Sequence, residues 1–128
     1  MFKKKNYKGD ALKALKQLKI KTKNISKFKG RKNSVIIDSV FGNGLNRPIS
    51  GTLKSVILRM NKLNKIISID IPSGINGDTG KILGCAVKAH TTLALHTKKI
   101  GHTLNPGKKY SGKIIVVEIG ISNKFNYV

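Results

Sequence analysis

Cysteine and long apolar runs are scarce in this chain of 128 residues. The single cysteine, Cys85, excludes a disulfide within the chain and agrees with a reducing compartment. No Cys/His cluster has zinc spacing, so a bound metal would need oxygen ligands. No stretch approaches the roughly 18 apolar residues of a membrane span, and no apolar run of a signal peptide follows residues 1–5. The sequence therefore predicts a cytoplasmic protein that does not enter a membrane.

Negative charge is also scarce, with five acidic residues against 26 lysines and arginines and a formal net charge of +21. A basic surface attracts phosphate groups, and 13 of the basic residues lie within residues 1–32. Lysine, asparagine and isoleucine all have A/T-rich codons, however, so genome composition can produce this bias without selection for binding. Because no RNA-binding pairing of aromatic with basic residues supports the charge, we do not expect nucleic acid as a partner.

Helical and strand patterns alternate along the chain. Apolar residues keep helical spacing from Ala11 to Leu18, with Asp10 as the expected N-cap, and residues 21–33 read as an exposed basic connection. Residues 83–89 are expected to include a short helix, and residues 101–112 a loop and turn. A longer helix carries the apolar stripe Leu53, Val56, Ile57, Met60 and Leu63, with Met60 in the core. The predicted strands are residues 35–37, 66–69, 91–95 and 113–119, the first of them buried on both faces.

This alternation is typical of right-handed βαβ units. We therefore expect an α/β protein with a Rossmann-like, three-layer α/β/α arrangement and a mainly parallel sheet. Residues 1–128 are expected to form one domain, with a basic helix and connection in residues 1–32 and an α/β core in residues 33–122.

Two aspartates, Asp38 and Asp70, each end a predicted strand and begin a glycine-rich turn. A lone aspartate at such a point is usually a turn or helix cap. In an open parallel sheet, however, ligands bind beyond the carboxyl ends of the strands, so two carboxylates at matching positions indicate one shared site.

Four segments resemble, in order and spacing, the NAD(P)H-hydrate epimerases, the YjeF N-terminal domain family. The resemblance implies a repair enzyme that interconverts the R and S hydrates of NADH and NADPH, so that a partner dehydratase can restore the cofactor. The segments are Asp38-Ser-Val-Phe-Gly-Asn-Gly-Leu-Asn-Arg-Pro48, Ile69-Asp-Ile-Pro-Ser-Gly74 with Asp78-Thr-Gly80, Lys99-Ile-Gly-His102 with Pro106-Gly107, and Val117-Glu-Ile-Gly-Ile121.

The same resemblance assigns residues to roles. Asp38 and Ser73 would hold a potassium ion, and Asp70 would contact the damaged ring of the hydrated cofactor. Epimerisation requires proton transfer, for which Asp70 is the first candidate and Lys99 the second. These side chains are expected to line one cleft with the segment that would bind the nucleotide: Gly42, Asn43, Gly44, Leu45, Asn46, Arg47 and Pro48.

The chain departs from the family pattern upstream of these segments. The family begins its nucleotide site with a strand and the turn Asn-Asn-Gly-Gly-Asp, for which residues 1–10 offer no room. We therefore expect the C-terminal part of an epimerase domain, truncated at its N-terminus. Its uncovered sheet should promote association, with a homodimer as one form. Two alternatives remain: a non-catalytic nucleotide- or RNA-binding module of the same fold, and a fragment without activity of its own.

The remaining chemically reactive residues favour structural roles. Cys85 is expected to be a buried, small apolar residue. His90, His96 and His102 form no triad or metal pattern and are expected to be exposed or packing residues, and Asp78 is expected to form a turn.

Overall fold

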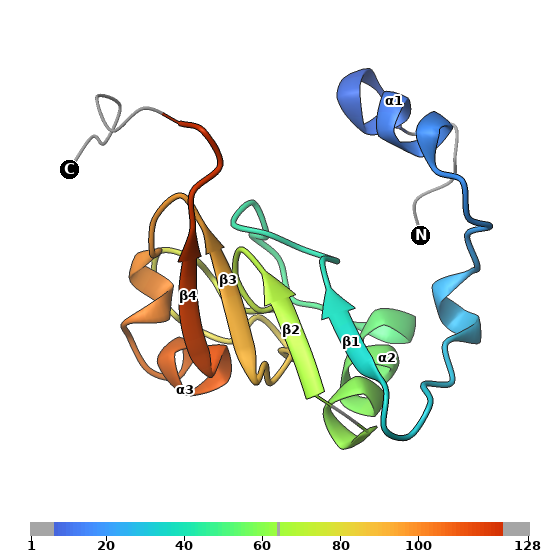
Figure 1. The fold of residues 1–128 in the computed structure, drawn as a ribbon. Helices are drawn as coiled ribbons and strands as arrows, with labels where there is room; N and C mark the ends of the chain where they lie inside the picture. The colour runs from blue at the N-terminus through green and yellow to red at the C-terminus, as the bar shows by residue number, and fades with distance from the viewer. Residues whose placement is uncertain (1–6, 64, 122–128) are drawn as a thin grey trace.

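A four-stranded, fully parallel sheet forms the centre of the protein in a computed structural model, which describes residues 7–63 and 65–121 (Figure 1). The spatial order follows the chain, so each strand pairs with the one that precedes it. This arrangement confirms the expected Rossmann-like α/β class. No helix in the described part of the chain is long and apolar enough to span a bilayer. The strands are β1 (Val35–Asp38), β2 (Lys65–Ile69), β3 (Thr91–Leu95) and β4 (Lys113–Val117).

Helices α2 (Gly51–Leu63) and α3 (Gly107–Ser111) cover one face of this sheet. Ile66 of β2 packs in a core cluster with the buried face of α2, and Thr92 of β3 donates its hydroxyl hydrogen bond to the carbonyl of Ser111 in α3, at 2.7 Å. The strand register places these two side chains on the same face. Within the described residues, the helices that pack on the sheet therefore form one layer, and not the two layers of the expected three-layer α/β/α arrangement.

The core lies between α2 and the sheet. The predicted stripe of α2 is confirmed at Val56, Ile57 and Met60, which are buried, while the side chain of Leu63 lies outside the described residues. Cys85 is buried in the same cluster as a free thiol, as expected. Burial raises the pKa of this thiol, and the nearby charge of Lys54 opposes the shift.

The opposite face of the sheet is apolar and open. Val35 and Ile37 of β1 are each 57% exposed and Ile115 of β4 is 41% exposed, so the prediction that the first strand is buried on both faces is wrong. No layer among the described residues packs against that side. The open face is made by alternate residues of the strands: Val35, Ile37, Ile67, Ile69, Leu93, Leu95, Ile115 and Val117.

We expect the 128-residue chain to self-associate through the open face, because contiguous exposed apolar surface favours association. Charge repulsion at +21 opposes association, so sedimentation velocity should show a larger species as salt concentration rises. The double variant Ile37→Thr, Ile115→Thr keeps β-branched side chains and should shift the protein to the monomer. Ile20→Thr, which alters an isoleucine 74% exposed but outside the sheet, is the control. An unaltered chain that is monomeric at all salt concentrations would contradict this expectation.

The N-terminal helix α1 (Gly9–Gln17) stands apart from the sheet and has no buried residue (Figure 1). The sequence pattern predicts Asp10 as the N-cap of this helix, and this prediction is wrong. Lys8 occupies that position, and the Asp10 carboxylate pairs instead with Lys13 at 3.0 Å. The connection to β1 is irregular apart from one 3₁₀ turn, η2 (Ile25–Lys27).

The prediction of a short helix near residues 83–89 is wrong. The backbone amides of Leu83 and Val87 donate to the carbonyls of Gly74 and Ser73, at 2.8 and 2.9 Å. These partners lie in the loop after β2 and replace the local hydrogen bonds of a helix. The connection from β3 to β4, expected to be a loop and turn, instead contains the 3₁₀ turn η3 (Ile100–His102) and the short helix α3.

Candidate active site at the carboxyl edge of the sheet

Asp38, at the end of β1, is the centre of a buried hydrogen-bond cluster. Its carboxylate is 1% exposed. Oδ2 accepts hydrogen bonds from the Ser68 hydroxyl at 2.8 Å and the Ser73 amide at 2.9 Å. Oδ1 accepts from the Ser73 hydroxyl at 2.6 Å and the Val40 amide at 3.4 Å. The carboxylate therefore fixes the loop that follows β2 against the loop that follows β1.

Ser73 extends this cluster toward the glycine-rich segment. Its Oγ accepts a hydrogen bond from the Phe41 amide at 2.9 Å and lies 3.3 Å from the Phe41 carbonyl oxygen. The next residue, Gly42, lies beside Asp70, since a Cβ added to Gly42 would be 3.6 Å from Asp70 Oδ2. The structure thus brings Asp38, Ser73, Gly42 and Asp70 together at one edge of the sheet.

Asp70 follows β2 directly and adopts a left-handed backbone conformation, with φ of 70°. This conformation is uncommon for a residue other than glycine. The Asp70 amide donates to the Leu93 carbonyl of β3 at 2.8 Å, which anchors the turn. Asp70 Oδ1 pairs with Lys99 Nζ, while Oδ2 faces Gly42. One carboxylate oxygen is therefore held by a cation and the other faces the glycine-rich segment.

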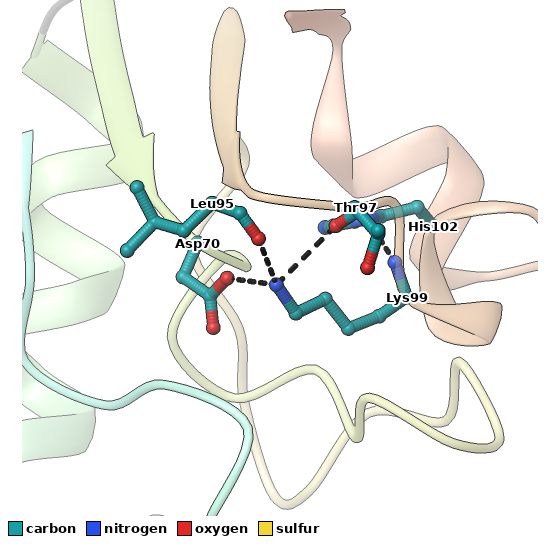
Figure 2. A network of polar contacts seen from close by, with 5 residues as sticks. All are labelled: Asp70, Leu95, Thr97, Lys99 and His102. Carbon is teal, nitrogen blue, oxygen red and sulfur yellow. Dashed lines mark hydrogen bonds and ion pairs between the residues drawn. The ribbon is translucent and has the colours of Figure 1, made fainter. Parts of the chain in front are cut away.

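Lys99 is held by the same edge of the sheet (Figure 2). Besides its ion pair with Asp70, Nζ donates to the carbonyl oxygens of Leu95 and Thr97, at 3.0 and 3.3 Å. The side chains of Lys99 and Asp70 are each 18% exposed. The three partners match the three donors of an ammonium group, so the side chain is fixed in place and still reaches solvent.

His102 forms hydrogen bonds with the backbone of Lys99. Its Nδ1 accepts a hydrogen bond from the Lys99 backbone amide at 3.0 Å, and the His102 amide donates to the Lys99 carbonyl at 3.0 Å (Figure 2). His102 is buried, with 1% of its surface exposed. The sequence pattern predicts only an exposed or packing residue at this position and does not indicate this contact. The spacing of three residues between Lys99 and His102 was its only available signal.

The segment from Gly42 to Pro48 follows the hydrogen-bond cluster around Asp38 in the chain, and its residues differ in burial and contacts. Leu45 is buried in the core cluster, so it can offer a ligand only its backbone. The side chain of Asn43 lies against Gly77, where an added Cβ would collide with it. The other members, Gly42, Gly44, Asn46, Arg47 and Pro48, are exposed.

Glycine residues allow the loop after β2 and the turn that carries Lys99 to pack backbone against backbone. The Gly101 amide donates to the Gly77 carbonyl at 2.6 Å, and the Gly107 amide to the Gly80 carbonyl at 2.9 Å. A Cβ on Gly101 would lie 2.4 Å from the Asn76 carbonyl oxygen, a separation that real Cβ atoms do not show. The loop after β2 and the turn that carries Lys99 therefore form one packed unit.

The oxygen atoms around Ser73 fit an alkali cation by chemical type. They comprise the Asp38 carboxylate, the Ser73 hydroxyl and the Phe41 carbonyl, which are the kinds of ligand that hard cations prefer. In the part of the chain that the structure describes, no group of three or more histidines, cysteines, aspartates or glutamates is placed to hold a metal ion.

Carboxylates at the ends of neighbouring parallel strands, an ion pair and a glycine-rich segment define an α/β protein with a candidate ligand site at the strand ends. Residues 1–101 match the family model described as YjeF-related protein N-terminus, and the chain belongs to this family.

Similar proteins carry names that describe an activity. The NAD(P)H-hydrate epimerase of Lentilactobacillus buchneri is 43% identical over 91 residues, which are 70% of this chain and 42% of that protein. The epimerase of Leuconostoc citreum is 42% identical over 89 residues, covering 69% and 40%. The bifunctional NAD(P)H-hydrate repair enzyme Nnr of Thermofilum pendens is 41% identical over 86 residues, covering 66% and 16%. The chain thus spans at most about two fifths of these relatives.

Proposed function

We propose that this chain acts in NAD(P)H-hydrate epimerisation, the interconversion of the R and S hydrates of NADH and NADPH. The observation that carries the proposal is the Asp70–Lys99 pair, with Asp70 Oδ2 facing the glycine-rich segment. The names of relatives at about 40% identity support the same reaction. The proposal makes the chain an isomerase.

The reaction needs a group that both gives and takes a proton. When the C–O bond at the hydrated carbon breaks, the hydroxyl leaves with an added proton as water. When water returns to the other face of the ring, it gives that proton up. Asp70 is the proposed proton carrier, because its Oδ2 is not engaged by Lys99. Lys99 is the proposed second residue of the proton-transfer pair. It orients Asp70 Oδ1 and exchanges the proton with Asp70.

The segment from Gly42 to Pro48 is the proposed site for the dinucleotide part of the substrate. Exposed backbone amides at Gly42 and Gly44 can approach a pyrophosphate closely, because neither residue carries a Cβ. Arg47 is exposed nearby in sequence and can pair with phosphate in a bidentate manner. These contacts would place the hydrated ring near Asp70.

Potassium is the proposed cation of this site. Asp38 and Ser73 would hold it, and the bound ion would supply positive charge for the phosphates of the substrate. The carboxylate, hydroxyl and carbonyl oxygens that meet at Ser73 support this assignment.

The proposed partner in the repair sequence is an NAD(P)H-hydrate dehydratase. The name of the bifunctional repair enzyme of Thermofilum pendens supports a link between the two activities. A second copy of this chain is a further proposed partner, supported by the open apolar face of the sheet.

We expect the chain to accelerate the equilibration of purified R and S hydrates of NADH above the spontaneous rate. Chiral chromatography of timed samples measures this directly, in buffers that contain potassium or only a bulky organic cation. The rate should be higher with potassium, since the proposed ion site would then be filled. Equilibration at the spontaneous rate in both buffers, together with RNA binding that weakens steeply with salt, would favour a binding module instead.

A further inference from the structure

The turn that carries Lys99 is closed by a buried side chain as well as by the backbone. The ring atom Nδ1 of His102 accepts a hydrogen bond from the Lys99 backbone amide at 3.0 Å. The backbone amide of His102 donates to the Lys99 carbonyl at 3.0 Å. The two residues therefore exchange hydrogen bonds in both directions across η3. Lys99 is fixed at its backbone by His102 and at its ammonium group by Asp70, Leu95 and Thr97 (Figure 2).

The contact requires a particular state of the imidazole. An Nδ1 that accepts a hydrogen bond carries no proton, so the neutral ring must hold its proton on Nε2. Burial lowers the pKa of His102, as do the charges of Lys99 and Lys98, while the Asp70 carbonyl and carboxylate oppose this shift. His102 is therefore neutral near pH 7, with its pKa below the usual value for histidine.

His102 Nε2 is fully buried and has no partner within hydrogen-bond distance among the described residues, although the Asp70 backbone carbonyl is near enough to raise the pKa of the ring. An apolar side chain of similar size could fill this position without burying a polar Nε2. The hydrogen bond that the ring makes within normal distance is the one between Nδ1 and the Lys99 amide.

We propose that His102 is a positioning residue that sets the backbone of Lys99, so that its ammonium group reaches Asp70. The inference rests on the proposed epimerase function for its catalytic consequence, but the contact itself can be tested without activity. A side-chain carbonyl oxygen at the position of Nδ1 should also accept the hydrogen bond from the Lys99 amide. Removal of the acceptor should release the turn and move Lys99 away from Asp70.

His90 provides a matched control within the same chain. Its Nδ1 accepts the Ile66 amide at 3.2 Å, and its own amide donates to the Ile66 carbonyl at 2.8 Å, so the local bonding resembles that of His102. His90 lies at the opposite ends of the strands from Asp70, since it precedes β3 and pairs with the start of β2. Because His90 is exposed and His102 is buried, His90→Leu controls for the loss of an imidazole–amide hydrogen bond, and His102→Asn controls for the change of a buried side chain.

The test compares His102→Leu, His102→Asn and His90→Leu. Leucine removes the acceptor at similar size, whereas the asparagine carbonyl can occupy the place of Nδ1. For His102→Leu we expect kcat to fall by about 10²-fold with little change in KM, because a misplaced catalytic group slows the chemical step. His102→Asn should restore most of kcat, and His90→Leu should leave kcat unchanged. Equal losses in His102→Leu and His102→Asn, or in His102→Leu and His90→Leu, would overturn the proposal.

Nitrogen NMR provides a readout that does not depend on activity. In the unaltered chain, the His102 ring should show the Nε2-protonated tautomer at pH 7, and the Lys99 ammonium signal should be protected from exchange. That protection should be lost in His102→Leu and kept in His102→Asn. A proton on Nδ1 in the unaltered chain would overturn the proposal even if His102→Leu fails to fold. Spontaneous-rate epimerisation with the expected spectra would instead reject the proposed function alone.

Discussion

Asp70→Asn is expected to slow the equilibration of the R and S hydrates by about 10²–10⁴-fold, which corresponds to roughly 3–5 kcal/mol in the activation free energy. The amide keeps the shape of the carboxylate and can still accept a hydrogen bond from Lys99 at Oδ1. It cannot exchange a proton at neutral pH, so the pair loses its proton carrier. The measurement is kcat from timed chiral chromatography at saturating substrate, with the spontaneous rate subtracted.

Asp78→Asn is the matched control for this variant, because it makes the same chemical change at an exposed aspartate outside the ion pair. It should keep the rate of the unaltered chain. Calorimetric titration with one hydrate should also show that Asp70→Asn still binds substrate. An unchanged kcat in Asp70→Asn would remove Asp70 from the reaction and leave Lys99 as the candidate proton carrier.

Asp38→Ala is expected to reduce the free energy of unfolding by about 3–5 kcal/mol. The substitution leaves the Ser68 hydroxyl, the Ser73 amide and the Ser73 hydroxyl without their buried acceptor. Because small proteins are stable by only about 5–15 kcal/mol, a large share of the native stability would be lost. Urea denaturation followed by circular dichroism gives the midpoint and the slope from which the change is obtained.

Asp10→Ala separates this effect from the simple loss of a negative charge. The Asp10 carboxylate is 96% exposed and pairs with Lys13 at the surface, so its removal should leave the midpoint nearly unchanged. If Asp38→Ala does not fold, Ser73→Ala removes one donor of the same cluster and should give a smaller loss in the same direction. Midpoints for Asp38→Ala and Ser73→Ala equal to that of Asp10→Ala would show that the cluster does not hold the loops together.

Local sequence patterns were sufficient for the elements whose partners are close in the chain. The strand at residues 91–95 and the burial of Met60 are confirmed, because alternation and helical spacing report directly on which side chains face a core. The placement of Asp38 and Asp70 at one edge also followed from the pattern, since parallel strands end on the same side.

Features that depend on distant partners could not be predicted in this way. Residues 83–89 are not helical because several of their amides bond to distant partners, among them those of Leu83 and Val87 to the loop after β2. The exposure of Val35 and Ile37 depends on which layers cover the sheet, and a run of β-branched residues does not carry that information. The contact between His102 and Lys99 requires the 3₁₀ turn η3, which the surrounding glycines had suggested to be an irregular loop.

The order of the strands has a consequence for how the protein assembles. Each strand after β1 pairs with the strand before it, so its first partner has already been synthesised when it emerges. The sheet can therefore grow in the direction of synthesis. The β1–α2–β2 unit and the loop after it already contain Asp38, Ser73 and Asp70. Lys99 and His102 follow β3 in the chain. During synthesis, the residues of the buried carboxylate cluster are therefore available before the partner that completes the ion pair at Asp70.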